Sequence, residues 1–265
     1  MAKFCPLFSG SSGNSTYISC SEGAILIDAG VSAKAITEAL QWHDVPADTI
    51  RAIFVTHEHG DHISGIRVFA SRHHIPVYSS AGTIQAMEDM GTLQGKVEVH
   101  TMDGEHPVQA AGMEIACFPT YHDCRESVGY VVTLPDGRRV AVCTDLGRVS
   151  TAVQQAIRGC DLVMLESNHD VRMLQNGSYP YYLKQRILGI NGHLSNESCA
   201  AELPYCIRHG ATRIVLGHLS KENNLEELAY ETVRLEITMG DNAYKPDDFP
   251  IFVANRSELS QMVEI

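Results

Sequence analysis

The chain has 265 residues, of which 44% are hydrophobic and 20% charged, the composition of an ordinary soluble globular protein. Its 20 Lys and Arg residues against 32 Asp and Glu residues give a formal net charge of −12. This charge argues against general attraction to polyanions, although bound divalent cations can reverse a local field. The sequence has no apolar run of the ~18–20 residues that a membrane-spanning helix needs and no recognisable secretory signal, so we expect a cytoplasmic protein.

The first half of the chain is predicted to alternate strands and helices. Three short strands come first, the first two separated by the Gly/Ser-rich loop SGSSGNS, and a helix with Ser32 as its N-cap follows. The next strand leads directly into a histidine-rich segment, and the last helix of this half has Ser79 or Ser80 as its N-cap. The predicted strands are 3–8, 16–20, 24–30, 51–56 and 75–80, and the predicted helices are 32–43, 63–74 and 81–90.

The second half is predicted to begin with five β-segments, two of which the turn LPDG joins into a hairpin. Helices and strands then alternate again. The β-segments are 96–100, 106–112, 113–120, 127–137 and 138–145, the later strands are 161–167, 212–218 and 249–255, and the helices are 150–159, 195–210 and 223–237. Because no repeat or linker interrupts the chain, we expect residues 1–265 to form a single α/β domain, a layered sandwich with helices on both outer faces.

The segment VTHEHGDHISG has a pattern typical of a metal site. His57, His59, Asp61 and His62 form the pattern H-x-H-x-D-H directly after an apolar strand, where a polar cluster is costly unless it binds something. Imidazole nitrogens and carboxylate oxygens suit zinc and similar divalent metals. In an extended turn His57 and His59 point to the same side, and a reversal at Gly60 brings Asp61 and His62 beside them, so one loop can serve two metals. A surface loop that is merely rich in histidine is the alternative.

Three further polar residues each follow an apolar strand. They are His122 after IACFPTY, Asp145 after VAVCT and His218 after RIVLG. The strand ends at one edge of a sheet are where α/β proteins gather their reactive side chains. Each of the three alone is most simply a structural residue, whereas together with the histidine-rich loop they complete a set of donors for two metals.

Five motifs in chain order, ILIDAG, THEHGDH, PTYHD, AVCTDLG and VLGHLS, resemble those of the metallo-β-lactamase fold, and the resemblance extends from about residue 4 to residue 255. It implies a four-layer αββα sandwich, in agreement with the predicted elements. It also implies two sets of metal ligands that share one carboxylate. These are His57, His59 and His122 for the first metal, Asp61, His62 and His218 for the second, and Asp145 for both. Asp28 would orient the loop and its ligands, as a partner of metal-bound histidine commonly does.

The superfamily includes lactamases, thioesterases, phosphodiesterases and nucleases, so the fold alone does not identify the substrate. Lactamases tend to have Cys at the bridging position, where this chain has Asp145, and a carboxylate that bridges two cations suits the hydrolysis of phosphate esters. The segments LESNHD, NGHLSNES and GHLSKENN resemble those of the RNase Z and RNase J enzymes, in which a further histidine helps to protonate the leaving oxygen. This resemblance makes His193 the candidate acid and Glu166 the residue that orients it.

One departure from the RNase J pattern indicates which branch of the superfamily the chain resembles. Those enzymes insert a large β-CASP domain between the bridging Asp and the last ligand, whereas 72 residues lie between Asp145 and His218 here. This length is too short for a full β-CASP insertion. The loop SGSSGNS and the compact second half are most similar to the YycJ/WalJ (VicX-like) branch, bacterial proteins described as 5′→3′ exonucleases.

Several small polar residues are candidates for binding a phosphate. The loop SGSSGNS can offer backbone N–H groups to an anion, and a plain flexible hairpin is the alternative. Polar residues near the other motifs can hold a phosphate or simply cap helices. The candidates are Ser11, Ser12, Asn14, Ser195, Ser220 and Asn223.

The sequence therefore predicts a metal-dependent phosphodiesterase or nuclease, a 5′→3′ exonuclease on DNA, that uses two divalent ions (zinc or manganese) to activate a water. Asp61 would accept the proton of that water as well as bind metal, and His193, oriented by Glu166, would protonate the departing 3′ oxygen. The expected partner is a nucleic acid, DNA in preference to RNA, and not a membrane. The main alternative is a hydrolase of a thioester, lactone or cyclic nucleotide, which would keep every ligand. A redox protein would use the same ligands for iron and would usually carry a flavin domain, and a non-enzymatic binding module would lack ligands.

Overall fold

The structure, a computed structural model, describes residues 1–256 and 260–265. Its strands form two sheets. The first contains β1 (Lys3–Phe8), β2 (Ser15–Cys20), β3 (Gly23–Ile27), β4 (Ile50–Phe54), β5 (Val77–Ser80), β6 (Val99–Met102) and β14 (Val263–Glu264). The second contains β7 (Val108–Ala110), β8 (Met113–Pro119), β9 (Val128–Thr133), β10 (Arg139–Cys143), β11 (Leu162–Glu166), β12 (Arg213–Gly217) and β13 (Ile251–Val253). The strand orders are β14-β1-β2-β3-β4-β5-β6 and β13-β12-β11-β10-β9-β8-β7.

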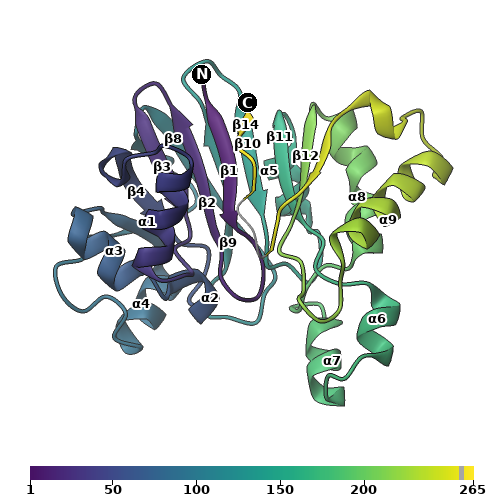
Figure 1. Ribbon diagram of the computed structural model, residues 1–265, viewed down its shortest axis with the longest axis horizontal. Helices are drawn as coiled ribbons and strands as arrows, with labels where there is room; N and C mark the ends of the chain where they lie inside the picture. The colour runs from purple at the N-terminus through teal and green to yellow at the C-terminus, as the bar shows by residue number, and fades with distance from the viewer. Residues whose placement is uncertain (257–259) are drawn as a thin grey trace.

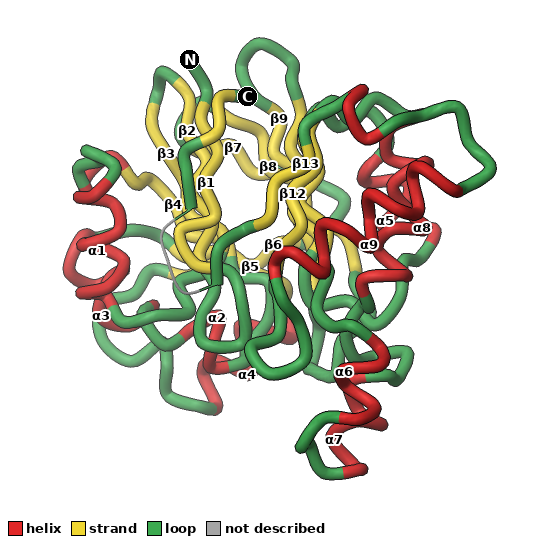
Figure 2. The backbone as a smooth tube through the Cα atoms, turned by 45° about the vertical axis from the view of Figure 1, so that its right-hand side comes forward, coloured by secondary structure: helices red, strands yellow, loops and turns green. Residues whose placement is uncertain are grey.

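Helices cover both outer faces of the paired sheets (Figure 1). The first sheet is covered by α1 (Ala33–Trp42), α3 (Ile66–His73) and α4 (Ala81–Asp89), and the second by α5 (Thr151–Ile157), α8 (Asn196–Arg208) and α9 (Glu226–Met239). Three short helices, α2 (Gly60–Ile63), α6 (Val171–Asn176) and α7 (Tyr181–Ile187), lie at the end of the sandwich away from the two chain termini (Figures 1 and 2). The predicted four-layer αββα sandwich is confirmed.

Alternating burial along the strands explains the layers. In β3, Ile25 and Ile27 pack between the two sheets, while Leu26 packs under the helices of the first sheet. In β10, Val142 packs between the sheets and Cys143 under the helices of the second. Because both faces of these strands are buried, they are nearly continuous apolar runs, and period-two alternation sends successive side chains into different layers.

The direction of the strands places the candidate site residues at one edge of each sheet. In the first sheet, β3 and β4 are parallel. In the second, β10, β11 and β12 are parallel, and β8 shares their direction because both β8 and β10 are antiparallel to β9. Within each sheet these strands therefore end at the same edge. The polar residues that follow them are Asp28, His57–His62, His122, Asp145 and His218.

Some predicted elements differ from those observed. The helix expected over 63–74 begins only at Ile66, as α3, and the separate short helix α2 ends at Ile63; Gly65, in the turn between them, donates its N–H to the carbonyl of Ala29 over 2.8 Å. The strand expected over 96–100 begins at Val99. Ser32 caps α1 as expected, and Ser80 rather than Ser79 caps α4. The sequence did not predict α6, α7 or β14, whose six, seven and two residues are too short to show a clear periodicity.

Between β10 and β12 the described chain contains α5, β11, α6, α7 and α8, as expected without a full β-CASP insertion. No helix among the described residues is both long enough and apolar enough to cross a membrane.

The layer between the sheets should carry much of the stability. Phe54 is fully buried there, and its ring stacks on Tyr78 with a centroid distance of 5.0 Å. Phe54→Ala should lower the free energy of unfolding by about 3–5 kcal/mol, because the lost ring leaves a cavity in a close-packed core. Urea denaturation measures this loss. Phe252→Ala, which removes a ring that is 39% exposed, is the control and should cost less than half as much; equal losses would contradict this account of the core.

Candidate metal centre

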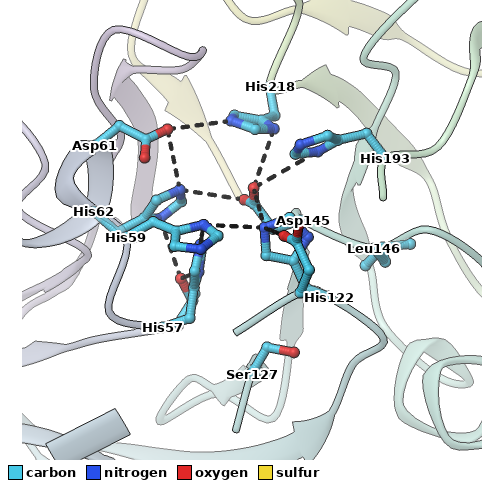
Figure 3. A network of polar contacts seen from close by, with 12 residues as sticks. His57, His59, Asp61, His62, His122, Ser127, Asp145, Leu146, His193 and His218 are labelled. Atoms are coloured by element: carbon cyan, nitrogen blue, oxygen red, sulfur yellow. Dashed lines mark hydrogen bonds and ion pairs between the residues drawn. The ribbon is translucent and has the colours of Figure 1, made fainter. Parts of the chain in front are cut away.

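The histidine-rich loop and the strand ends of the second sheet converge on one cluster of side chains (Figure 3). Three ring nitrogens face one another: His59 Nδ1 lies 3.0 Å from His57 Nε2 and 3.2 Å from His122 Nε2. A second group surrounds Asp61, whose Oδ2 lies 3.7 Å from His62 Nε2 and 3.8 Å from His218 Nε2. Each group offers three donor atoms close enough to hold one metal ion.

Asp145 lies between the two groups. Its Oδ2 is 3.4 Å from His62 Nε2, and its Oδ1 is 3.8 Å from His122 Nε2 and 3.4 Å from His218 Nδ1. Burial raises the pKa of this carboxyl, and the surrounding imidazoles, with His218 foremost, lower it below its ordinary value. The structure therefore brings together all seven of the expected ligands.

Close backbone contacts hold the histidine-rich loop in place. Asn14 donates its N–H to the carbonyl of Asp61 over 2.8 Å, and Gly30 donates its N–H to the carbonyl of Asn14 over 2.7 Å. A Cβ atom at Gly30 would lie 1.6 Å from the carbonyl oxygen of Asp61. Only glycine fits there, which explains the last residue of the motif ILIDAG.

Asp28 orients two parts of this loop. One carboxylate oxygen accepts the backbone N–H of Thr56 over 2.8 Å, and the other accepts the Thr56 hydroxyl over 2.9 Å and lies 2.8 Å from His62 Nδ1. The other ring nitrogen of His62 consequently faces the cluster. Burial lowers the pKa of His62, but the carboxylates of Asp145, Asp28 and Asp61 more than offset this and raise it to about 9. A metal at His62 Nε2 would replace a proton.

The backbone is strained where strands of both sheets end at the cluster. Asp28, Asp145 and His218 have φ angles of 62°, 57° and 56°, in the left-handed region that residues other than glycine rarely adopt. The His218 backbone is fixed on both sides, because its N–H donates to Ser9 Oγ over 2.8 Å and its carbonyl accepts from Asn168 Nδ2 over 2.9 Å.

Glu166 connects His193 to His218. Its Oε1 lies 2.8 Å from His193 Nδ1 and 2.7 Å from His218 Nδ1, and its Oε2 accepts the backbone N–H groups of Leu146 and Leu194. Burial raises the pKa of Glu166, but the imidazole of His193 and then that of His218 hold it below the usual range. An ionised carboxylate only accepts hydrogen bonds, so both Nδ1 atoms donate to it. Neither Nε2 atom is engaged by Glu166, and that of His218 lies 3.8 Å from Asp61 Oδ2.

The donor set fits a divalent metal. Asp145 Oδ2 and His218 Nε2 are buried, and neither has a hydrogen-bond partner among the described residues. Such orphaned polar atoms are costly unless an ion or water satisfies them. Their neighbours are imidazole nitrogens and carboxylate oxygens, the ligands that zinc and similar cations prefer.

A pocket of about 250 Å³ gives access to the cluster. Of the candidate phosphate-binding residues, Ser11 and Ser220 lie in its lining. The other four candidates do not line it. Ser12 is exposed, and Asn14 contacts Asp61 and His62. Ser195 caps α8, and Asn223 is buried.

Several residues at the site were missed by sequence reasoning. Thr56 connects Asp28 to the histidine-rich loop by donating its N–H to the Asp28 carboxylate. Its position directly before His57 could have indicated this role. Asn168 fixes His218 and lines the pocket. The unexpected segment around α7 also supplies part of the pocket wall, through Tyr179, Leu183, Arg186 and Ile187.

A family model described as the beta-lactamase superfamily domain matches residues 24–219. The chain belongs to the β-lactamase superfamily. It is 36% identical over 99% of its length to "Exodeoxyribonuclease WalJ" of Streptococcus pneumoniae serotype 2, covering 98% of that protein, and 37% identical to "Exodeoxyribonuclease YycJ" of Bacillus anthracis, covering 87% of each chain. Among solved structures, Zn²⁺-bound PqqB from Methylobacterium extorquens superposes with a TM-score of 0.75 at 15% identity, over 99% of this chain and 100% of that one. This superfamily membership, in the YycJ/WalJ branch, and the buried His/Asp cluster together make this a divalent-metal site.

Replacing the Asp28 carboxylate should weaken metal binding. Asp28→Asn removes a charged acceptor from His62 and Thr56, and losing such a partner typically lowers metal affinity by about 10- to 100-fold. Titration with a fluorescent zinc chelator measures the affinity, and circular dichroism checks that the variant is folded. Asp136→Asn, in an exposed turn, is the control. Unchanged zinc affinity in Asp28→Asn would contradict the role given to this residue.

Proposed function

We propose that the protein is a metal-dependent nuclease, a 5′→3′ exonuclease that acts on DNA. The observation that carries the proposal is the position of Glu166 and His193: a buried carboxylate holds an imidazole directly beside two groups of metal donors that share Asp145. The names of the relatives, exodeoxyribonucleases at 36% and 37% identity, support the same activity.

Two divalent ions, zinc or manganese, would be held in this site. The first would bind His57, His59 and His122, the second Asp61, His62 and His218, and Asp145 would bridge them. When bound, such ions polarise the phosphoryl oxygen, acidify a water and neutralise the charge that develops in an in-line displacement.

The chain's own residues would move the protons. Asp61 is partly open to the pocket, and burial raises the pKa of its carboxyl less than His218 and His62 lower it, so the carboxylate is ionised and can accept the proton of the attacking water. His193 donates Nδ1–H to Glu166, which directs Nε2 toward the pocket. Protonated at Nε2, His193 can protonate the departing 3′ oxygen, and the ionised Glu166 stabilises the imidazolium.

Ser11 and Ser220, on the pocket wall, are the phosphate-binding candidates that the geometry supports best. Phosphate binding remains a prediction for the other four candidates, which are Ser12, Asn14, Ser195 and Asn223. The one-domain organisation over residues 1–265 also stays a prediction, supported by the layer between the sheets, where Phe4 and Ile265 pack together with residues of the second sheet. The cytoplasmic location stays a prediction as well.

A second candidate is a hydrolase of a small thioester, lactone or cyclic nucleotide. The volume of the pocket favours it, because about 250 Å³ is near the lower end of the roughly 300–1,000 Å³ typical of small-molecule pockets. A nuclease with this pocket would bind the rest of its strand on the surrounding surface.

A substrate panel separates the two candidates. Protein loaded with Mn²⁺ or Zn²⁺ should shorten single- or double-stranded DNA labelled at its 3′ end, progressively from the 5′ end, faster than it degrades RNA and without cleaving a generic thioester. Gel electrophoresis of labelled products measures this. Cleavage of the thioester alone would replace the nuclease with the small-molecule hydrolase.

The proposed general acid gives a second prediction. His193→Ala should lower kcat for DNA by about 10²–10⁴-fold, the usual contribution of a positioned proton donor, with metal content unchanged. Single-turnover kinetics and elemental analysis of the same preparation measure the two quantities. His209→Ala, which alters a histidine near the end of α8, is the control. Full activity of His193→Ala would remove His193 from the mechanism.

A further inference from the structure

The segment from α6 to α7, residues 171–192, differs in charge from the rest of the chain. The whole protein has 32 acidic residues and a net charge of −12, yet no Asp or Glu occurs between Asp170 and Glu197. The same stretch contains Arg172, Lys184 and Arg186. We refer to residues 171–192 as the α6–α7 arm.

The α6–α7 arm projects from one end of the sandwich (Figures 1 and 2), and side chains of α7 line the pocket that gives access to the metal centre. Arg186 forms a forked ion pair with Asp123, the residue after His122. His193 donates its N–H to the carbonyl of Ile187 over 2.9 Å. These contacts attach α7 to the loops that carry a candidate ligand and the candidate acid, so the arm has a fixed position beside the pocket.

The arm presents aromatic rings to solvent. Tyr181 and Tyr182 are 76% and 74% exposed, and Ile190 is also exposed. Exposed aromatic rings together with cations are the features that bind single-stranded nucleic acid, because bases stack on the rings while cations attract phosphates.

The two tyrosines face different directions. Leu183, Arg186 and Ile187 line the pocket and therefore define the inner side of α7. At ~100° per residue, Tyr182 lies about 40° from Arg186 around the helix axis, at the edge of that side, whereas Tyr181 lies about 140° from Arg186 on the outer side. Tyr179, three residues before Tyr182, lines the pocket too.

We propose that the α6–α7 arm binds the single strand of DNA that continues beyond the pocket, with Tyr182 stacking on a base. This inference rests on the proposed nuclease function, because it identifies where the part of the strand that the small pocket does not hold is bound. The occupant is a single strand: exposed bases are required for stacking, and the exposed Arg172, in an arm without acidic residues of its own, complements the phosphate charge.

The test compares Tyr182→Ala with Tyr181→Ala, a matched control of the same residue type, exposure and helix. The first readout is fluorescence anisotropy of a labelled phosphorothioate oligodeoxythymidylate, which resists hydrolysis, with Mn²⁺-loaded protein. The second is kcat and KM for single-stranded DNA and for bis(p-nitrophenyl) phosphate, a small diester that cannot reach the arm. Tyr182→Ala should weaken oligonucleotide binding and raise KM for DNA by about 10-fold, Tyr182→Phe should restore both, and Tyr181→Ala should match the wild type.

The remaining outcomes separate this inference from the proposed function. Equal DNA affinity and KM in Tyr182→Ala and wild type would overturn the inference and leave the nuclease intact. A wild type that binds the oligonucleotide but does not cleave DNA would refute the nuclease, while the Tyr182 comparison would still decide the role of the arm. A wild-type dimer that Tyr182→Ala dissociates, with DNA affinity unchanged, would make the arm an interface between two copies and overturn the inference.

Discussion

The site depends on one buried carboxylate between the two sheets. Asp145 follows β10 of the second sheet, and its oxygens lie 3.4 Å from His62, in α2, and 3.4 Å from His218, which follows β12. An isolated ionised carboxylate at this depth would be very costly, so the surrounding imidazoles stabilise the fold as well as providing donors for a metal. The left-handed backbone at Asp145 and His218 shows that local strain is tolerated to keep this contact.

A second buried carboxylate, Glu166, positions the proposed general acid, His193. It is fully buried, and it orients His193 and His218 at once. The proposed acid and one proposed metal ligand therefore share a single hydrogen-bond acceptor. Because both imidazoles contact the same oxygen of Glu166, a substitution at one will alter the hydrogen bonding of the other. The effects of substitutions at His193 and His218 on activity should therefore not be additive.

Much of this could be predicted from the sequence, for identifiable reasons. The apolar strands and the motif from His57 to His62 are local patterns, and they gave the sandwich and the cluster that the structure brings together. The pairing of Asp28 with Thr56 depends on register between neighbouring strands, which local pattern does not specify. The contacts of Asn14, a candidate for binding phosphate, with Asp61 and His62 could not be predicted either, because they depend on the close approach of two loops that Gly30 allows. The arm was missed because α6 and α7 are each shorter than two helical turns, although its lack of acidic residues was visible in the sequence.

Anomalous X-ray diffraction from crystals grown with Zn²⁺ or Mn²⁺ tests the central claim most directly. The account predicts two anomalous peaks per chain, one contacted by His57, His59 and His122 and the other by Asp61, His62 and His218, with an Asp145 oxygen at both. A folded protein whose crystals show no peak between the two sheets, or a peak that Asp145 does not contact, would contradict it.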